Sequence, residues 1–347
     1  MLLGFYSVAM ALGGALFIAL TYVTNASWNV AFRRVPEAMA MILAPTGLVL
    51  LAILAIHGRQ YAWHPDSPEA AAGTFWFKEL WTTPTFWMIR AVTYIALWLL
   101  LSRVLVTASR RQDHSKSLGL TLFNRRISAI FLLVYAPTFA LASCDWLMLL
   151  DPMWFSTIFG VYNFAGMVQA ALAAMIILAI VLRRHGPLHD VFSDDHLHDL
   201  SKLLLGFSCF WMYIWFSQYM LIWYTNMPEE TAYYLLRTRG PWGPLMVANI
   251  ALNWIIPFFS LLPRQSKRNE SIMLKIATVI LIGHWLDLYI MIFPATLGST
   301  PMFGLWELVS GGLAVGFFGW AFFRAFAQAS PVPSGDPLLA ESLHYHC

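Results

Sequence analysis

Charged residues are scarce in this chain of 347 residues: they make up 11% of it, whereas apolar residues make up 59%. An average soluble domain has about 25% charged residues, so the composition excludes an ordinary soluble protein. The net charge of +3 is too small to indicate a nucleic-acid partner. The 16 Trp and 25 Phe are typical of a helix bundle with aromatic belts at the two surfaces of a membrane. Lipid is therefore an expected partner.

Cysteine is scarce as well. The three residues, Cys144, Cys209 and Cys347, form no CxxC or CxxCH pattern. The sequence therefore shows no motif for a zinc site, an iron–sulfur cluster or a covalently attached c-type haem. We assign no metal ligand and no catalytic residue, and any electron transfer is expected to belong to cofactors in partner subunits.

Long apolar stretches dominate the rest of the chain. A spanning helix needs about 20 mostly apolar residues, and nine stretches qualify. We predict an all-α integral membrane protein with a membrane domain over residues 1–328. The tail, 329–347, is predicted to be an extended cytoplasmic arm that needs a partner to order it. The predicted spans are 2–24, 38–57, 84–107, 124–143, 155–182, 202–224, 244–262, 272–293 and 304–327.

The first span has no basic segment before it and no clean cleavage site after it, so we expect a retained helix and not a signal peptide. With nine alternating spans, 16 of the 21 basic residues fall on one side of the membrane. The positive-inside rule makes that side cytoplasmic. The C-terminus is then cytoplasmic and the N-terminus faces outward. Arg90 lies within the third span, and the other side holds Arg59, Lys78, Arg237 and Arg239.

An ionisable pair interrupts the eighth span. His284 and Asp287 lie three residues apart in the apolar stretch Ile276–Pro294, and side chains at this spacing share a helix face. Ionisable groups at bilayer depth are costly, which makes the pair a candidate functional site. A histidine donates or accepts near neutral pH, and a carboxylate can fix its tautomer. The alternative is a hydrogen bond between helices that only fixes packing.

Three further residues are placed in the outer half of the membrane domain. Arg90 lies deep enough to need a partner or to extend to the lipid headgroups, and its candidate partners are Asp145, Asp287 and Glu307. Glu307 also suits the first turn of its helix. The sequence leaves open whether Asp145 and Glu307 act in function or in structure.

The loops contain further polar residues. Asp151 precedes a proline, a pattern that favours an N-cap at the start of the fifth helix. Residues 225–242 predict a short interfacial helix that starts at Pro228 and is capped by Thr225 or Asn226. Its Tyr233 and Tyr234 are expected to lie on the membrane or on another subunit. The run 185–199, rich in His and Asp, is predicted to be a solvated loop and not a metal site.

Several loop sequences resemble a known family. The stretches SCDWLMLLDPMWFSTIFGVYNFAG (143–166), QYMLIWYTNMPEETAYYLLRTRGPW (218–242) and GHWLDLYIMIFPA (283–295) are similar to the ActF subunits of bacterial alternative complex III. So are FRRVPEAMA (32–40) and DPLLAESL (336–343). These subunits belong to the NrfD-like group, which is similar to the membrane anchor of polysulfide reductase.

The resemblance implies two four-helix bundles, at about 1–143 and 155–293, with a flanking helix at 304–327. It implies the bacterial inner membrane as the location. The implied partners are a homologous ActC-type subunit, an iron–sulfur ActB-type subunit, c-type haem subunits and a terminal oxidase as a further candidate. Such complexes oxidise quinol, and in the family the better-attested quinol site belongs to ActC. For ActF, a proton route and scaffolding are the roles implied.

The hypothesis from the sequence is one polar cluster of His284, Asp287 and Asp145, with Arg90 and Glu307 nearby and Asp151 as a further candidate. The cluster would pass protons or hold the headgroup of a quinol such as menaquinol. Two alternatives come from other classes of protein, namely a secondary transporter or channel and a purely structural membrane anchor. Pro137, in the middle of the fourth span, is the main residue that fits the broken helices of transporters.

Overall fold

A computed structural model describes residues 1–58, 80–151, 154–298 and 300–346, and these residues form helices and connecting turns without any strand. Within these ranges, nine helical segments are long and apolar enough to cross a membrane. The predicted all-α, multi-pass membrane architecture is confirmed. Arg59, Lys78 and Pro152 lie outside the described residues.

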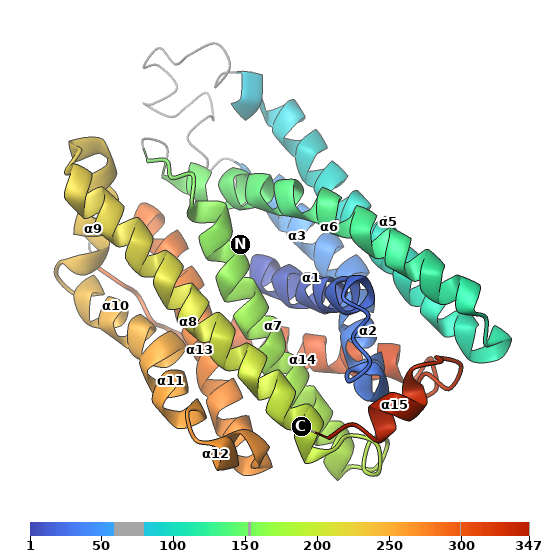
Figure 1. Ribbon diagram of the computed structural model, residues 1–347. Helices are drawn as coiled ribbons and strands as arrows, with labels where there is room; N and C mark the ends of the chain where they lie inside the picture. Colours follow the sequence, from blue (N-terminus) through green and yellow to red (C-terminus); the bar gives the residue numbers. More distant parts are fainter. Residues whose placement is uncertain (59–79, 152–153, 299, 347) are drawn as a thin grey trace.

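Two of the nine spans each join two α-helices, and each of the other seven contains one α-helix (Figure 1). The second span joins α2 (Arg34–Met41) and α3 (Leu43–His57). The seventh joins α10 (Trp242–Ile250) and α11 (Ile256–Leu261) through a π-helical turn, Ala251–Ile255. The single-helix spans are α1 (Leu2–Val23), α5 (Pro84–Ser115), α6 (Leu118–Trp146), α7 (Phe159–Arg184), α8 (Asp194–Thr225), α13 (Glu270–Leu297) and α14 (Leu305–Phe326).

Several helices are longer than the predicted spans. Hydropathy detects only the part of a helix that lies in the apolar core of the bilayer, about 20 residues. α5 and α8 each have 32 residues. Their extra turns carry polar residues beyond that core. The shorter elements are 3₁₀ turns at Val30–Phe32 and Met148–Leu150 and the helices α9 (Pro228–Thr238), α12 (Arg264–Arg268) and α15 (Leu339–Leu343).

The spans form two groups that meet at α1 and α7. In the first group α1 packs on α3 and α6, and α5 packs on α6; in the second α7 packs on α8 and α13, and α10 packs on α13. The apolar windows of α1 and α7 are each 83% buried. Gly13 allows the close contact between them, because a Cβ there would lie 2.3 Å from the Cβ of Ala171.

α14 lies outside both groups. It contacts α2 and α1, and its apolar window is only 11% buried. This placement fits the predicted flanking helix.

The C-terminal tail corrects one prediction, because it docks on its own chain without a partner (Figure 1). Asp336 forms a buried ion pair with Arg33. The Ser342 hydroxyl accepts from the amide of Ala31 at 3.0 Å and donates to the carbonyl of Trp28 at 2.9 Å. These contacts supply the order that Pro- and Ser-rich composition alone does not indicate.

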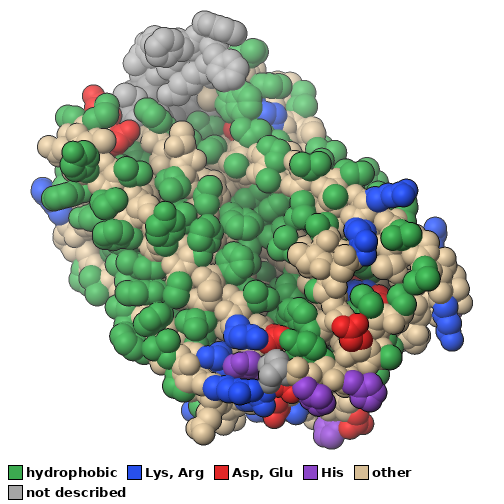
Figure 2. Space-filling view, viewed as in Figure 1, with side chains coloured by type: hydrophobic (Ala, Val, Ile, Leu, Met, Phe, Trp, Pro, Cys, Tyr) green, Lys and Arg blue, Asp and Glu red, His purple; other side chains and the backbone are tan. Residues whose placement is uncertain are grey.

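Charged side chains gather at the lower and right edges of the face shown in Figure 2, around α12, α15 and the ends of α5 and α6. A buried network lies at this end. Arg34 forms ion pairs with Glu37 and Asp113, and the Ser109 hydroxyl donates to Glu37 at 2.5 Å. Glu37 lies in the first turn of α2. We call the end of the molecule formed by α12, α15 and the adjoining ends of α5 and α6 the basic end.

The docked tail generates a prediction. Asp336→Asn leaves the buried Arg33 without its carboxylate, and breaking a buried pair costs about 3–5 kcal/mol. We expect the tail to detach more often and chymotrypsin to remove it at least about tenfold faster, as followed by mass spectrometry. Glu341→Gln is the control, since Glu341 is exposed and the amide oxygen of Gln can still accept from the hydroxyl of Ser27. Equal cleavage rates in the two variants would show that the pair does not hold the tail.

Candidate functional site

Asp287 is the point at which all four spans of the second group meet. Its carboxylate accepts from the hydroxyl of Tyr162 on α7, from the indole nitrogen of Trp211 on α8 at 3.1 Å and from the amide of Asn249 on α10 at 2.7 Å. Asp287 itself is on α13 and is 1% exposed. No Arg, Lys or His forms an ion pair with it within the part of the chain that the structure describes.

The π-helical turn positions the amides beside this carboxylate. Asn253 lies within the turn and donates to the side-chain oxygen of Asn249 at 2.7 Å. The wider turn leaves the Asn253 carbonyl available to two other side chains, Gln169 and Ser208, which both donate to it at 2.6 Å. Such turns are rare and are frequent at functional sites. The result is a continuous chain of polar contacts from Gln169 and Ser208 to Asp287.

His284 lies one turn before Asp287 and is 2% exposed. Its ring packs against the ring of Tyr6, with 5.3 Å between centroids. It also lies over Gly166 of α7, where a Cβ would approach its Cε1 to 2.9 Å. Neither ring nitrogen has a hydrogen-bond partner among the described residues. A buried polar side chain without any partner is uncommon and points to a bound water or another group.

Both side chains of the predicted pair therefore face α7, at Gly166 and Tyr162, which are one helical turn apart. The shared face follows from the spacing of three residues. The expected role of the carboxylate in fixing the histidine tautomer has no support, because the hydrogen bonds of Asp287 go to Tyr162, Trp211 and Asn249.

A small cavity extends from Asp287 toward α9. Its volume, counted as the space open to the centre of a water molecule, is about 10 Å³. Its lining includes Gln218, Tyr234 and Arg237. A buried water needs about 10–15 Å³ measured in this way, so the space suits about one water molecule. The side-chain nitrogen of Gln218 is buried and has no partner among the described residues, so it provides one donor for such a water.

Asp145 belongs to a different site from Asp287. The guanidinium of Arg90 binds its two carboxylate oxygens at 2.9 and 3.0 Å. The indole of Trp81 and the hydroxyl of Tyr94 donate to it at 2.8 and 3.1 Å. The single cluster expected from the sequence is thus two clusters, one in each group of helices. Asp145 was among the three predicted partners of Arg90, and it is the one that the structure selects.

Asp151 does not cap the fifth span, which begins at Phe159. It ends the 3₁₀ turn before the span and accepts from Arg237 at 3.4 Å. The N-cap prediction was wrong because the chain continues for several residues before the next helix forms.

Arg237 was not singled out in the sequence. It is 1% exposed and lies on α9, which begins at Pro228 as predicted, with Met227 and not Thr225 or Asn226 at the N-cap. The guanidinium donates to the carbonyls of Ile290 and Met291 at 3.0 and 3.1 Å. It thereby ties α9 to α13, one turn beyond Asp287. The sequence signal for the burial of Arg237 was its position one turn after Tyr233, which places both side chains on the same face of the helix.

The tyrosines of α9 correct another expectation. Tyr233 and Tyr234 are buried within this chain, and the ring of Tyr233 stacks on Trp154 with 3.8 Å between centroids. Burial raises the pKa of both phenols, that of Tyr234 well above its ordinary value. Both side chains therefore remain protonated donors at neutral pH.

The remaining candidates have structural roles. The Glu307 carboxylate accepts from the amide of Gly304 at 2.8 Å and caps α14, so it takes no part in either cluster. Only the first part of the run 185–199 is a loop, because α8 starts at Asp194 and buries His196 and His198. No group of three or more potential metal ligands occurs among the described residues.

A scan against protein-family models finds no match to this chain, and a search of curated proteins finds no similar protein.

The chemistry of the Asp287 site follows from its donors. All three hydrogen bonds stabilise the ionised carboxylate, whereas burial without a cation favours the neutral acid. Such a group can exchange a proton without a large rearrangement of its neighbours. Asp145, in contrast, is held by a guanidinium on both oxygens.

The contacts of Arg237 generate a prediction. Arg237→Leu leaves the carbonyl of Ile290 unsatisfied, because Pro294 in the next turn of α13 has no N–H to donate to it. An unsatisfied buried group costs about 1–3 kcal/mol. We expect a clearly lower temperature of thermal unfolding in detergent, followed by tryptophan fluorescence. Arg239→Leu removes an equal charge from an exposed position and is expected to behave like the wild type. If both variants unfold at the wild-type temperature, Arg237 does not join α9 to α13.

Proposed function

We propose that this chain is a membrane subunit of a quinol-oxidising respiratory complex and that it carries protons through Asp287. The complex would be of the alternative complex III type, with an ActC-type membrane subunit and partner subunits that hold the iron–sulfur clusters and c-type haems. The loop sequences similar to ActF subunits support the complex. The observation that carries the proton role is the buried carboxylate, which three neutral donors hold and with which no cation among the described residues forms an ion pair.

The polar contacts on either side of Asp287 support a route. Toward the basic end, Asn249 and Asn253 connect the carboxylate to Gln169 and Ser208. Toward α9, the small cavity leads to Arg237, which contacts the partly exposed Asp151. In this proposal a proton that arrives at a carboxylate oxygen of Asp287 makes the neutral acid. That proton then leaves through a water in the cavity.

Direct quinol binding by this chain is the second candidate function. The two unpartnered nitrogens of His284 favour it, since a quinol hydroxyl could donate to one of them. The size of the cavity favours proton transfer, because 10 Å³ suits about one water and ligand pockets usually reach ~300 Å³ or more. We therefore place proton transfer first.

These observations favour the proposal over the two alternatives raised from the sequence, a secondary transporter and a purely structural anchor. A secondary transporter needs room for its solute at the midplane, and the space beside Asp287 suits a single water. A purely structural anchor would satisfy its buried polar groups within the protein, and those of His284 are unsatisfied by the described residues. The excess of basic residues at one end supports an orientation with that end cytoplasmic, and the resemblance to ActF subunits implies the bacterial inner membrane.

The proton role predicts the behaviour of Asp287→Asn. The amide keeps the size of the side chain but cannot take up a proton, so quinol-dependent turnover or proton release should fall at least about tenfold, in line with the usual contribution of a positioned acid or base. Turnover is measured as electron transfer to the acceptor and proton release with a pH dye in sealed vesicles. Unchanged values for both would exclude Asp287 from the route.

Two further variants make this test specific. Glu307→Gln changes an acid that only caps α14 and should leave turnover and proton release unchanged. Asp145→Asn leaves a buried guanidinium unpaired, and we expect a lower yield of assembled protein. A variant of Asp287 that also fails to assemble would indicate a structural role for the carboxylate.

Membership of a complex predicts the outcome of gentle purification. After solubilisation in a mild detergent, the chain should co-elute with subunits that contain haem and iron–sulfur clusters, as seen by optical and paramagnetic resonance spectra of the eluted fraction. A chain that elutes alone, without these cofactors, would favour the transporter.

A further inference from the structure

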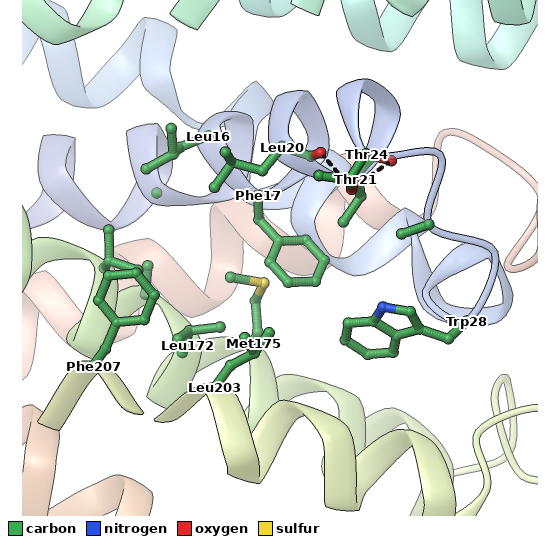
Figure 3. Close-up of a pocket in the computed structure, with 14 residues that line it drawn as sticks. Leu16, Phe17, Leu20, Thr21, Thr24, Trp28, Leu172, Met175, Leu203 and Phe207 are labelled. Carbon is green, nitrogen blue, oxygen red and sulfur yellow. Dashed lines mark hydrogen bonds between the residues drawn. The ribbon is translucent and has the colours of Figure 1, made fainter. Parts of the chain in front are cut away.

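A groove between α1, α7 and α8 is separate from the Asp287 site (Figure 3). The groove has a volume of about 210 Å³. Its α1 wall runs from Gly13 to Thr24, a rise of ~16 Å at ~1.5 Å per residue. This length is about half of the ~30 Å apolar core of a bilayer. The groove therefore spans the depth of one leaflet, from the basic end to the midplane.

The lining of the groove is apolar. Phe17 and Met175 face each other across its middle, with Leu172, Leu203 and Phe207 around them (Figure 3). The hydroxyls of Thr21 and Thr24 donate to backbone carbonyls of their own helix, so neither hydroxyl needs a partner from the groove. Apolar cavities of this kind stay free of water and accept hydrocarbon.

The rim of the groove has the character of a membrane interface. Trp28 lines it there, with its ring edge-to-face on Phe17 at 6.1 Å between centroids. Asn25, next to Thr24, has a positive φ of 54°, a conformation that asparagine tolerates at the end of a helix. Its amide oxygen accepts from the guanidinium of Arg125 on α6. A tryptophan thus lines this end of the groove, and an arginine binds the residue next to the lining Thr24, as expected at the headgroup level.

No described residue of the chain neutralises the charge of Arg125. No carboxylate lies within ion-pair distance of it in the described part of the chain, and its Nε is buried without a partner. The adjacent Arg126 is exposed and adds a second positive charge. An apolar groove one leaflet deep, with a guanidinium beside its rim that has no ion-pair partner among the described residues, complements a hydrocarbon chain attached to an anionic headgroup.

We propose that this groove binds one anionic phospholipid, with an acyl chain between α1, α7 and α8 and its phosphate against Arg125. The site lies between the two groups of helices, where α1 meets α7. The bound lipid would fill the gap that α8 leaves beside α1. This inference is independent of the proton route.

Native mass spectrometry of the full chain, with any subunits that co-purify, tests the site. The delipidated protein is mixed with equal amounts of dioleoyl phosphatidylglycerol and dioleoyl phosphatidylethanolamine, which share their acyl chains and differ in headgroup charge. We expect the wild type to retain one phosphatidylglycerol with a preference of about tenfold, as a hydrogen bond to a charged group provides.

Matched variants separate the headgroup from the acyl chain. Arg125→Gln should bring the preference close to one. Arg103→Gln removes an equal charge from an exposed position on α5, which does not line the groove, and should keep the preference at about tenfold. Leu203→Trp fills the groove from its partly exposed edge and should abolish retention of both lipids.

Three results would overturn the proposal. The first is equal retention of the two phospholipids by the wild type. The second is the same preference in Arg125→Gln as in Arg103→Gln, which decides the matter even if Leu203→Trp fails to fold. The third is displacement of phosphatidylglycerol by an equal amount of an isoprenoid quinone, which would assign the groove to an uncharged lipid.

Discussion

The second group of helices is built around a carboxylate that lies deep in an apolar domain. Lipid cannot satisfy polar groups, so each one must find its partner within the protein. Asp287 meets this requirement with a phenol, an indole and an amide, one from each of the three other spans of its group. The same contacts that hold these four helices in register therefore also define the site. The π-helical turn, the chain of amides and the water-sized cavity all lie beside this carboxylate.

The first group solves the same problem in a different way. Asp145 occupies a comparable place near the end of α6, but a guanidinium binds both of its oxygens. A buried pair of this kind fixes both charges, and removing either partner is costly. Asp287 has neutral donors only, so both of its protonation states are supported. The contrast between these two acids supports our proposal of proton exchange at Asp287 and a structural role for Asp145.

The sequence predicted the features that depend on hydropathy and depth. The nine spans, the pairing of Arg90 with an acid at its own depth, and the shared face of His284 and Asp287 all follow from counting residues along helices. What it could not predict depends on packing between distant segments. Arg237 is buried because carbonyls of α13 lie beside α9. The tail is ordered because Asp336 forms an ion pair with the buried Arg33. The single predicted cluster divided in two because depth in the membrane does not determine which helices are neighbours.

Infrared difference spectroscopy tests the proton role of Asp287 most directly. A protonated carboxyl group has its own C=O stretching band, which shifts when the exchangeable hydrogen is replaced by deuterium. Between the oxidised and the quinol-reduced complex, we predict a change in such a band that is absent from Asp287→Asn and retained in Glu307→Gln. A difference spectrum of Asp287→Asn identical to that of the wild type would contradict the assignment of proton exchange to this carboxylate.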